Sequence, residues 1–204
     1  MTAHFVKLFT HPNFAWTEIR EEEEHHPRHY LGHLLLLSLI PAVCLFIGTT
    51  LVGWGLAENE TVKLSQASAL QLSGLLYLTI LAGVVIMGLF IRWMSRTFDA
   101  RPTANQCIGF VAYTATPFFV AGVTGLYPER WLAVTLLGLA SIYSTFLLYT
   151  GLPTFMRVRK EEGLLFSTCT WGVGLLVLVT MLVLMILIWF NVLTPEYMRP
   201  PVTS

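Results

Sequence analysis

One segment of the sequence, EEEEHHPRHYLGH at residues 21–33, carries residue types that could bind a metal ion. His29 and His33 are four positions apart, so on a helix they would share one face. Imidazole nitrogens and carboxylate oxygens are ligands of divalent ions such as zinc. The candidate ligands are His25, His26, His29, His33 and Glu22. Runs of charge beside a membrane are more often solvated collars, so we expect no cofactor and keep a divalent metal as the alternative.

Two apolar segments carry polar side chains at the spacing of one helix face. This intramembrane polar stripe consists of Gln106, Tyr113, Thr116 and Pro117 in the first segment and Ser141, Ser144, Thr145 and Tyr149 in the second. Pro117 has no N–H to donate to the carbonyl of Tyr113, which predicts a kink. Hydroxyls inside a membrane commonly hydrogen-bond neighbouring helices, and we favour this interpretation. The alternative is that both halves of the stripe line one path for a solute.

A short charged loop, RVRKEEG, separates two of the apolar segments. Its charged residues are Arg157, Arg159, Lys160, Glu161 and Glu162. Cations near the end of one helix and carboxylates near the start of the next complement the helix dipoles, each contributing about 0.3 to 1 kcal/mol. Beyond this structural role, the loop is our candidate surface for docking a partner protein.

Five segments are long and apolar enough to cross a membrane, which takes roughly 20 residues at about 1.5 Å per residue. They comprise residues 31–57, 70–94, 107–126, 131–156 and 164–193. The sequence therefore predicts an all-α integral membrane protein, a bundle of five transmembrane helices. Residues 1–30 form an N-terminal arm whose scattered apolar side chains predict partial insertion at the headgroup level, and residues 194–204 form a tail.

Lysine and arginine are distributed unevenly between the two sides of this predicted bundle. Nine lie in the N-terminal arm and in the second and fourth loops, and three lie in the first and third loops and the tail. By the positive-inside rule, this distribution predicts a cytoplasmic N-terminus and a C-terminus outside the cytoplasm.

Composition narrows the classes of function. Of the 204 residues, 55% are hydrophobic and 12% charged, a balance that excludes a water-soluble globule. Twelve basic and twelve acidic residues leave no positive excess for nucleic acid. The sequence has no Gly-rich phosphate loop, no Ser/His/Asp set and no HExxH motif, and we expect no ionisable group deep in a span. These features predict a protein that is not an enzyme.

Several motifs resemble those of one family. HPNFAWTEIREE before the spans, AYTATPFFVAGVTGLYP in the third span and IYSTFLLYTGLPTFMRVRKEEGLLFS from the fourth span onward are similar to the bacterial branch of the Yip family, named for Ypt-interacting proteins. The resemblance implies a five-span protein of the bacterial inner membrane with a cytoplasmic N-terminus and a periplasmic C-terminus. Eukaryotic members bind Rab-type GTPases through a longer N-terminal region. Because residues 1–30 alone precede the first predicted span here, that role is not carried over.

Two functions from different classes follow. The one we favour is a membrane-organising or protein-interaction role, with the lipid bilayer and an unidentified membrane or cytoplasmic protein as partners, nucleic acid excluded and a homo-oligomer allowed. The alternative is a small channel or transporter for an ion or divalent metal, with a His/Glu-rich cytoplasmic collar. The two are distinguished by whether Tyr113, Thr116, Ser144 and Tyr149 line one continuous path.

Overall fold

The computed structural model describes residues 12–25, 29–57, 60–98, 100–127, 129–193 and 197–198. The helices of this part of the chain are α2 (Pro12–His25), α3 (His29–Ile47), α4 (Gln66–Ser95), α5 (Ala104–Thr114), α6 (Thr116–Ala121), α7 (Arg130–Met156) and α8 (Lys160–Asn191). Shorter helical turns extend them, namely η1 (Gly48–Val52), η2 (Arg96–Phe98) and η3 (Gly122–Leu126). Three short strands, β1 (Trp54–Ala57), β2 (Glu60–Leu64) and β3 (Tyr197–Met198), pair antiparallel in the order β1-β2-β3.

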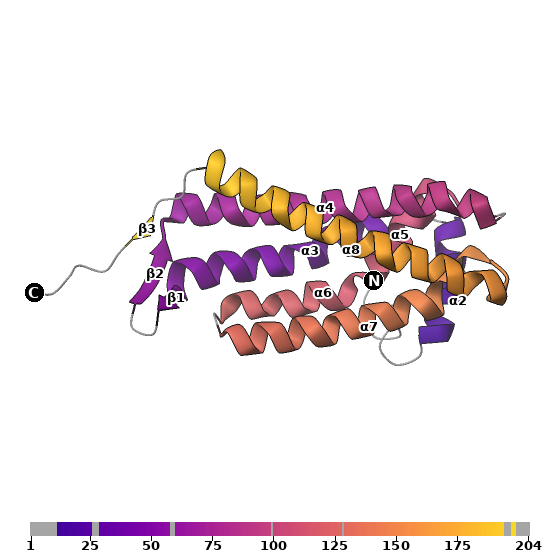
Figure 1. Ribbon diagram of the computed structural model, residues 1–204, viewed down its shortest axis with the longest axis horizontal. Helices are drawn as coiled ribbons and strands as arrows, with labels where there is room; N and C mark the ends of the chain where they lie inside the picture. Colours follow the sequence, from indigo (N-terminus) through magenta and orange to yellow (C-terminus); the bar gives the residue numbers. More distant parts are fainter. Residues whose placement is uncertain are drawn as a thin grey trace, which may run out of the picture.

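Four helices of the structure are each long and apolar enough to span a membrane: α3 with η1, α4 with η2, α7 and α8. The pair α5 and α6 with η3 makes a fifth span when its two parts are counted together, with a bend of 43° between them. The long helices lie side by side along the longest axis of the molecule (Figure 1). The prediction of an all-α membrane bundle with five spans is confirmed.

The bend between α5 and α6 lies beside Pro117. Helix α5 ends at Thr114, and Ala115 separates it from α6. Pro117 stands in the first turn of α6, where a backbone N–H would have no partner within the helix. The kink that the sequence predicts from this proline is therefore present.

Glycines let the bent span lie close to α3. A Cβ atom added at Gly122 would lie 2.4 Å from Cβ of Pro41, and one added at Gly125 would lie 3.0 Å from the backbone nitrogen of Leu45. Small residues at such contacts allow the backbones of membrane helices to approach each other. The bent span, which carries the first half of the polar stripe, is thus held directly against α3.

The first span ends before the predicted limit at residue 57. Its helical residues stop at Val52, and Gly53 turns the chain with a φ of 83°, a conformation that glycine adopts at low cost. Trp54–Ala57 then form β1 and pair with β2. The apolar sequence WGLA suits a strand as well as a helix, so hydropathy alone placed these residues in the span.

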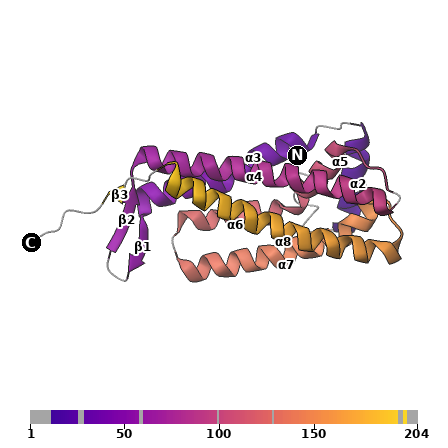
Figure 2. The same ribbon diagram turned by 45° about the horizontal axis from the view of Figure 1, so that its top comes forward.

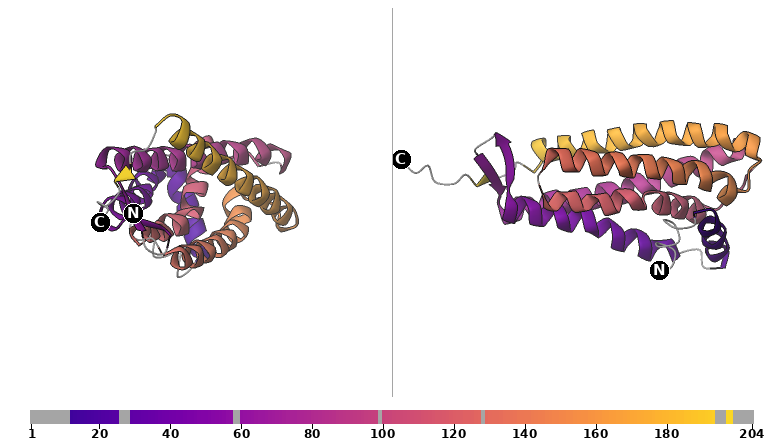
Figure 3. Two further views of the ribbon diagram at one scale, coloured as in Figure 1. Left: turned by 60° about the vertical axis from the view of Figure 1, so that its left-hand side comes forward. Right: turned by 90° about the horizontal axis from the view of Figure 1, so that it is seen from below.

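The N-terminal arm forms a helix that crosses one end of the bundle. Helix α2 lies at the opposite end from strands β1 and β2 (Figures 1 and 3), and we call these the α2 end and the β end. Trp16 and Ile19 are fully buried, whereas Phe14 is 73% exposed. The structure therefore places Trp16 and Ile19 in a protein core, and partial insertion of the arm at the headgroup level stays a prediction.

The outer faces of the long helices are apolar and uncovered. Helix α8 contacts α4 and α7 and otherwise lies along the outside of the bundle (Figure 2). Only 6% of the most hydrophobic 18-residue stretch of this helix is buried, and residues such as Leu176 are exposed. A continuous apolar surface of this kind is solvated by lipid and not by water.

Candidate functional site

Trp16 of α2 is fully buried in an aromatic cluster at the α2 end. Its ring centroid lies 4.9 Å from that of Phe110 in α5 and 6.0 Å from that of Phe155 in α7. A Cβ atom added at Gly151 would lie 2.3 Å from Cε2 of Trp16, so this position of α7 accepts the indole because it has no side chain. Helix α2 is therefore joined to two spans through one aromatic cluster.

Arg20, one turn further along α2, fastens the helix to the end of α7. Its Nη1 donates a hydrogen bond to the carbonyl oxygen of Phe155 at 2.8 Å, and the guanidinium lies over the Phe155 ring, 5.2 Å from the centroid. Carbonyls in the last turn of a helix lack partners within the helix and carry partial negative charge. Arg20 thus places α2 directly beside the loop that follows α7.

Glu23 on the same face of α2 is 1% exposed, which is unusual for a carboxylate. Its Oε1 accepts a hydrogen bond from the backbone N–H of Tyr30 at 3.0 Å, and its Oε2 has no partner among the described residues. Burial raises the pKa of Glu23 from 4.5 to about 7, the Tyr30 N–H lowers it, and the neighbouring Glu22 charge raises it further. Glu23 is therefore a carboxyl group poised to change charge near neutral pH.

His33 lies inside the bundle, 3% exposed, and not in a solvated collar. Its Nε2 lies 2.9 Å from Oγ1 of Thr116, and its ring centroid lies 4.4 Å from that of Tyr113. Both partners belong to the bent span, on either side of the break at Ala115. His33, near the start of α3, therefore joins this helix to the bend.

The two halves of the predicted polar stripe meet different partners. Tyr113 and Thr116 contact His33 of α3. On α7, by contrast, the hydroxyl of Tyr149 lies 3.0 Å from Oγ1 of Thr168, and Nε1 of Trp171 donates to Oγ1 of Thr145 at 3.0 Å, so these residues face α8. The structure thus pairs the hydroxyls between helices in two separate interfaces.

The remaining residues of the stripe are used locally. Gln106 and Thr103 form a capping box at the start of α5, and Ser141 donates to the carbonyl of Leu137 in its own helix. Ser144 is buried, and its hydroxyl has no partner in the part of the chain that the structure describes. Pro117 acts through the bend. None of these local contacts requires a solute.

The histidine segment is divided between three environments. Nδ1 of His25 lies 2.8 Å from the Glu21 carbonyl oxygen, Nε2 of His29 lies 3.4 Å from Oε1 of Glu22, and His33 is paired with Thr116. His26 lies outside the described residues. Among the residues that are described, no group of three or more His, Cys, Asp or Glu side chains is arranged to hold a metal ion. Metal binding by this segment stays a prediction.

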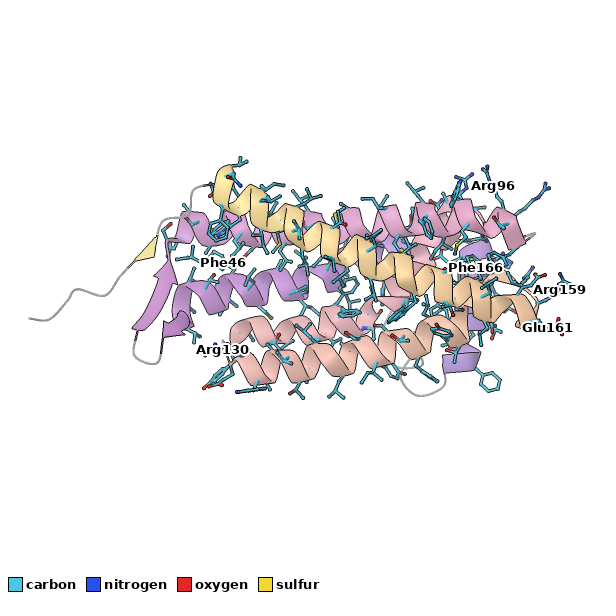
Figure 4. The ribbon with its side chains drawn as sticks, in the orientation of Figure 1. Phe46, Arg96, Arg130, Arg159, Glu161 and Phe166 are labelled. Atoms are coloured by element: carbon cyan, nitrogen blue, oxygen red, sulfur yellow. The ribbon has the colours of Figure 1, made fainter. Side chains whose placement is uncertain are left out.

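The predicted docking loop lies at the α2 end, where Figure 4 shows Arg159 and Glu161. Helix α7 ends at Met156, Arg157 takes the left-handed conformation with φ 55°, and Arg159 forms an ion pair with Glu162. Arg157, Arg159 and Glu161 are exposed, and the side chain of Lys160 lies outside the described part of the structure.

Through Arg20, this loop adjoins α2. We call the exposed face of α2, with Phe14, Thr17 and Glu21, together with loop residues 157–162, the docking platform.

Sequence reasoning missed the residues that fix α2 in place, namely Trp16, Arg20 and Glu23. A signal was present, because Trp16, Ile19 and Glu23 recur at the spacing of one helix face. Their partners Gly151 and Phe155 are remote in the sequence, and nothing local marks them as a contact for an N-terminal helix. The contacts that hold α2 in place can therefore be identified only from the tertiary structure.

Long apolar helices with charges gathered at the ends, and a short helix docked across one end, define a multi-pass integral membrane protein. The Yip1 domain family model matches residues 6–193, and the chain belongs to this family. Two relatives, both named inner membrane protein YohC, from Escherichia coli strain K12 and from an O6:H1 strain of Escherichia coli, are each 42% identical over 187 residues, 92% of this chain and 96% of the relative. No solved structure matches the chain significantly. The resemblance seen in the motifs is confirmed.

Proposed function

We propose that this Yip1-family protein is a non-enzymatic component of the bacterial inner membrane that organises the membrane or binds a partner protein through the docking platform. The observation that carries the proposal is the fixed position of α2 beside the loop after α7. Arg20 bridges the two elements at 2.8 Å, and Trp16 is fully buried below them. Two exposed, chemically varied segments are thereby presented as one surface, as a protein-binding site requires.

The charge distribution supports a cytoplasmic location for the platform. The nine lysine and arginine residues on one side of the predicted topology include Arg20 of α2 and Arg157 and Arg159 of the loop after α7, all at the α2 end. The positive-inside rule then orients the α2 end toward the cytoplasm and the β end toward the periplasm. In this orientation the platform would face cytoplasmic proteins and the membrane surface.

The partners of the polar stripe favour interaction over transport. A path between α5 and α7 would need hydroxyls from both helices on its wall. Tyr113 and Thr116 instead contact α3, and Thr145 and Tyr149 contact α8. Contacts of this kind are expected between packed membrane helices. The contacts of these residues therefore do not support a transport path between α5 and α7.

The proposal is tested by reversing charges on the loop. The variant Lys160→Glu, Glu161→Lys and Glu162→Lys should insert normally, because exposed ion pairs contribute little to stability. We expect it to lose a protein that co-purifies with the tagged wild-type chain from gently solubilised membranes, as quantified by mass spectrometry. The matched control reverses Glu129→Lys and Arg130→Glu at the β end, where Figure 4 shows Arg130.

The control should retain the partner at the wild-type level. Equal recovery of every co-purifying protein by the loop variant and the control would contradict the proposal. Failure of the loop variant to insert would instead assign residues 157–162 to topology and helix capping alone.

A further inference from the structure

A cavity of about 550 Å³ opens at the α2 end, outside the docking platform and the polar stripe. Its lining consists of Arg92, Ser95, Arg96, Arg101, Pro102, Thr103 and Ala104. These residues come from the end of α4, the connection through η2, and the start of α5. Figure 4 shows Arg96 at this end of the bundle. The volume is within the range of about 300 to 1,000 Å³ that small-molecule sites occupy.

Three of the lining residues are arginines. In the described part of the chain, the guanidinium groups of Arg92, Arg96 and Arg101 form no hydrogen bond or salt bridge, so their donors are available. Asp99 is the single acidic residue in the sequence from 92 to 104, which leaves a formal charge of +2. Guanidinium groups match the oxygens of a phosphate with paired, charge-assisted hydrogen bonds. The side chains therefore favour an anion.

The backbone adds to this positive field. Thr103 caps α5, and the capping box uses the N–H groups of Gln106 and Thr103. The N–H of Ala104, at the first position of the helix, has no acceptor within the helix and belongs to a residue that lines the cavity. An anion in the cavity would therefore also meet the positive end of the α5 dipole.

Helix capping explains part of this arrangement but not all of it. Arg92 and Arg96 lie in the last turn and at the C-cap of α4, where cations complement the dipole. Arg101 lies beyond η2, outside both helices, and still lines the same cavity. A third arginine in the lining of the same cavity is not needed to cap a helix.

The level of the cavity relative to the membrane indicates which anions it would meet. Residues 66–91 of α4 contain no charged residue, and Arg92 is the first. Trp93 beside it is 68% exposed, as are many tryptophans at the membrane–water interface. The cavity therefore lies where an apolar span passes into the headgroup layer, the level at which lipid phosphates lie.

We propose that this cavity binds a phosphate group through Arg92, Arg96 and Arg101. The phosphate belongs either to the headgroup of an anionic phospholipid or to a soluble phosphate ester, because both present the same oxygens to the guanidinium groups. The site is independent of the docking platform and does not require a protein partner.

The test uses the purified full chain in detergent, titrated in two arms with binding measured by calorimetry. The first arm compares short-chain phosphatidylglycerol with phosphatidylcholine of equal chain length, and the second adds glycerol 3-phosphate with sodium chloride as the control. Saturation by phosphatidylglycerol alone identifies a lipid site, and saturation by glycerol 3-phosphate identifies a site for soluble phosphate. The variant Arg96→Gln with Arg101→Gln should bind about 10-fold more weakly or worse.

The variant Arg130→Gln at the β end removes a charge of the same kind and should bind as the wild type does. Because Arg96 and Arg101 are exposed, their removal should leave the unfolding midpoint unchanged. If the midpoint does shift, the variant Arg96→Lys with Arg101→Lys replaces the first one. It keeps the charge, loses the paired hydrogen bonds and should show intermediate affinity. No saturable binding in either arm, or equal affinity in the double variant and in Arg130→Gln, would overturn the proposal.

Discussion

Glu23 shows how a single residue can make the docking of α2 depend on pH. With its pKa raised from 4.5 to about 7, the docked carboxyl stays protonated where the detached one ionises. Docking is therefore strongest below about pH 4.5 and weakens as the pH rises toward 7, by up to about 3 kcal/mol. The variant Glu23→Gln should remove this dependence, because its amide oxygen can still accept the hydrogen bond from Tyr30.

The measurement is protease protection of α2 in nanodiscs between pH 4.5 and 8, compared for the wild type and Glu23→Gln. Nε2 of His29 lies 3.4 Å from Oε1 of Glu22 close by, and both residues are present in the two proteins, so the difference between their profiles isolates Glu23. Identical profiles would show that Glu23 does not control docking.

Gly151 is the residue on which the Trp16 contact depends. The variant Gly151→Ala places a Cβ within 2.3 Å of the buried indole, which cannot move without losing its contacts with Phe110 and Phe155. We expect a loss of about 1 to 3 kcal/mol in stability and increased cleavage within α2. The control is Gly138→Ala in the same helix, where no atom lies within 4 Å of the added Cβ and helix propensity favours alanine. Equal stability of the two variants would rule out this packing role.

At the scale of elements, the contact of His33 with Thr116 joins α3 to the bent span. The variant Thr116→Val keeps the shape of the side chain and removes the hydroxyl that lies 2.9 Å from Nε2 of the buried His33. Hydrogen bonds between membrane helices contribute roughly 0.6 kcal/mol on average, with a maximum near 1.7, and we expect a loss in the upper part of this range. Unfolding in mixed micelles measures it. The control Thr135→Val removes a hydroxyl that bonds within its own helix, and an equal loss there would contradict a joining role.

The sequence predicts some of these elements well because their signals are local. A run of apolar residues longer than the hydrocarbon layer predicts a span wherever it occurs, and Pro117 predicts a bend without knowledge of its neighbours. His33 illustrates the limit. It belongs to a run of histidines in the sequence, while its partner Thr116 lies 83 positions away. The residues of β1 likewise read as part of the first span, because the hydropathy of WGLA does not reveal the strand with which they pair.

At the scale of the whole molecule, the orientation in the membrane follows from the distribution of lysine and arginine. Single cysteines introduced at Thr2 and Thr203, in a background without the three native cysteines, report the two termini. In intact cells with a permeable outer membrane, an impermeant maleimide should label the Thr203 position and not the Thr2 position. Disrupted cells should give labelling at both. The reverse pattern in intact cells would invert the topology and place the α2 end in the periplasm.

The docking platform is a property of the whole molecule, because its two segments come together only when the chain is folded. Helix α2 and residues 157–162 are far apart in the sequence and meet through the contact between Arg20 and Phe155, 135 positions apart. The sequence identified the loop by its charges and by its resemblance to a family. It could not identify α2 as the other half of the platform, because an amphipathic helix before a span is equally suited to a membrane surface.

Photocross-linking in living cells from both halves of the docking platform tests most directly whether the two halves bind one partner. A photoreactive amino acid is placed at Phe14 or Thr17 of α2, at Arg157 of the loop, or at the lipid-facing control positions Val134 and Leu176, all of which are exposed. If the platform is one protein-binding surface, the α2 and loop positions will give adducts of one and the same partner, and the controls will not. Adducts from the lipid-facing positions alone, or different partners for α2 and the loop, would contradict it.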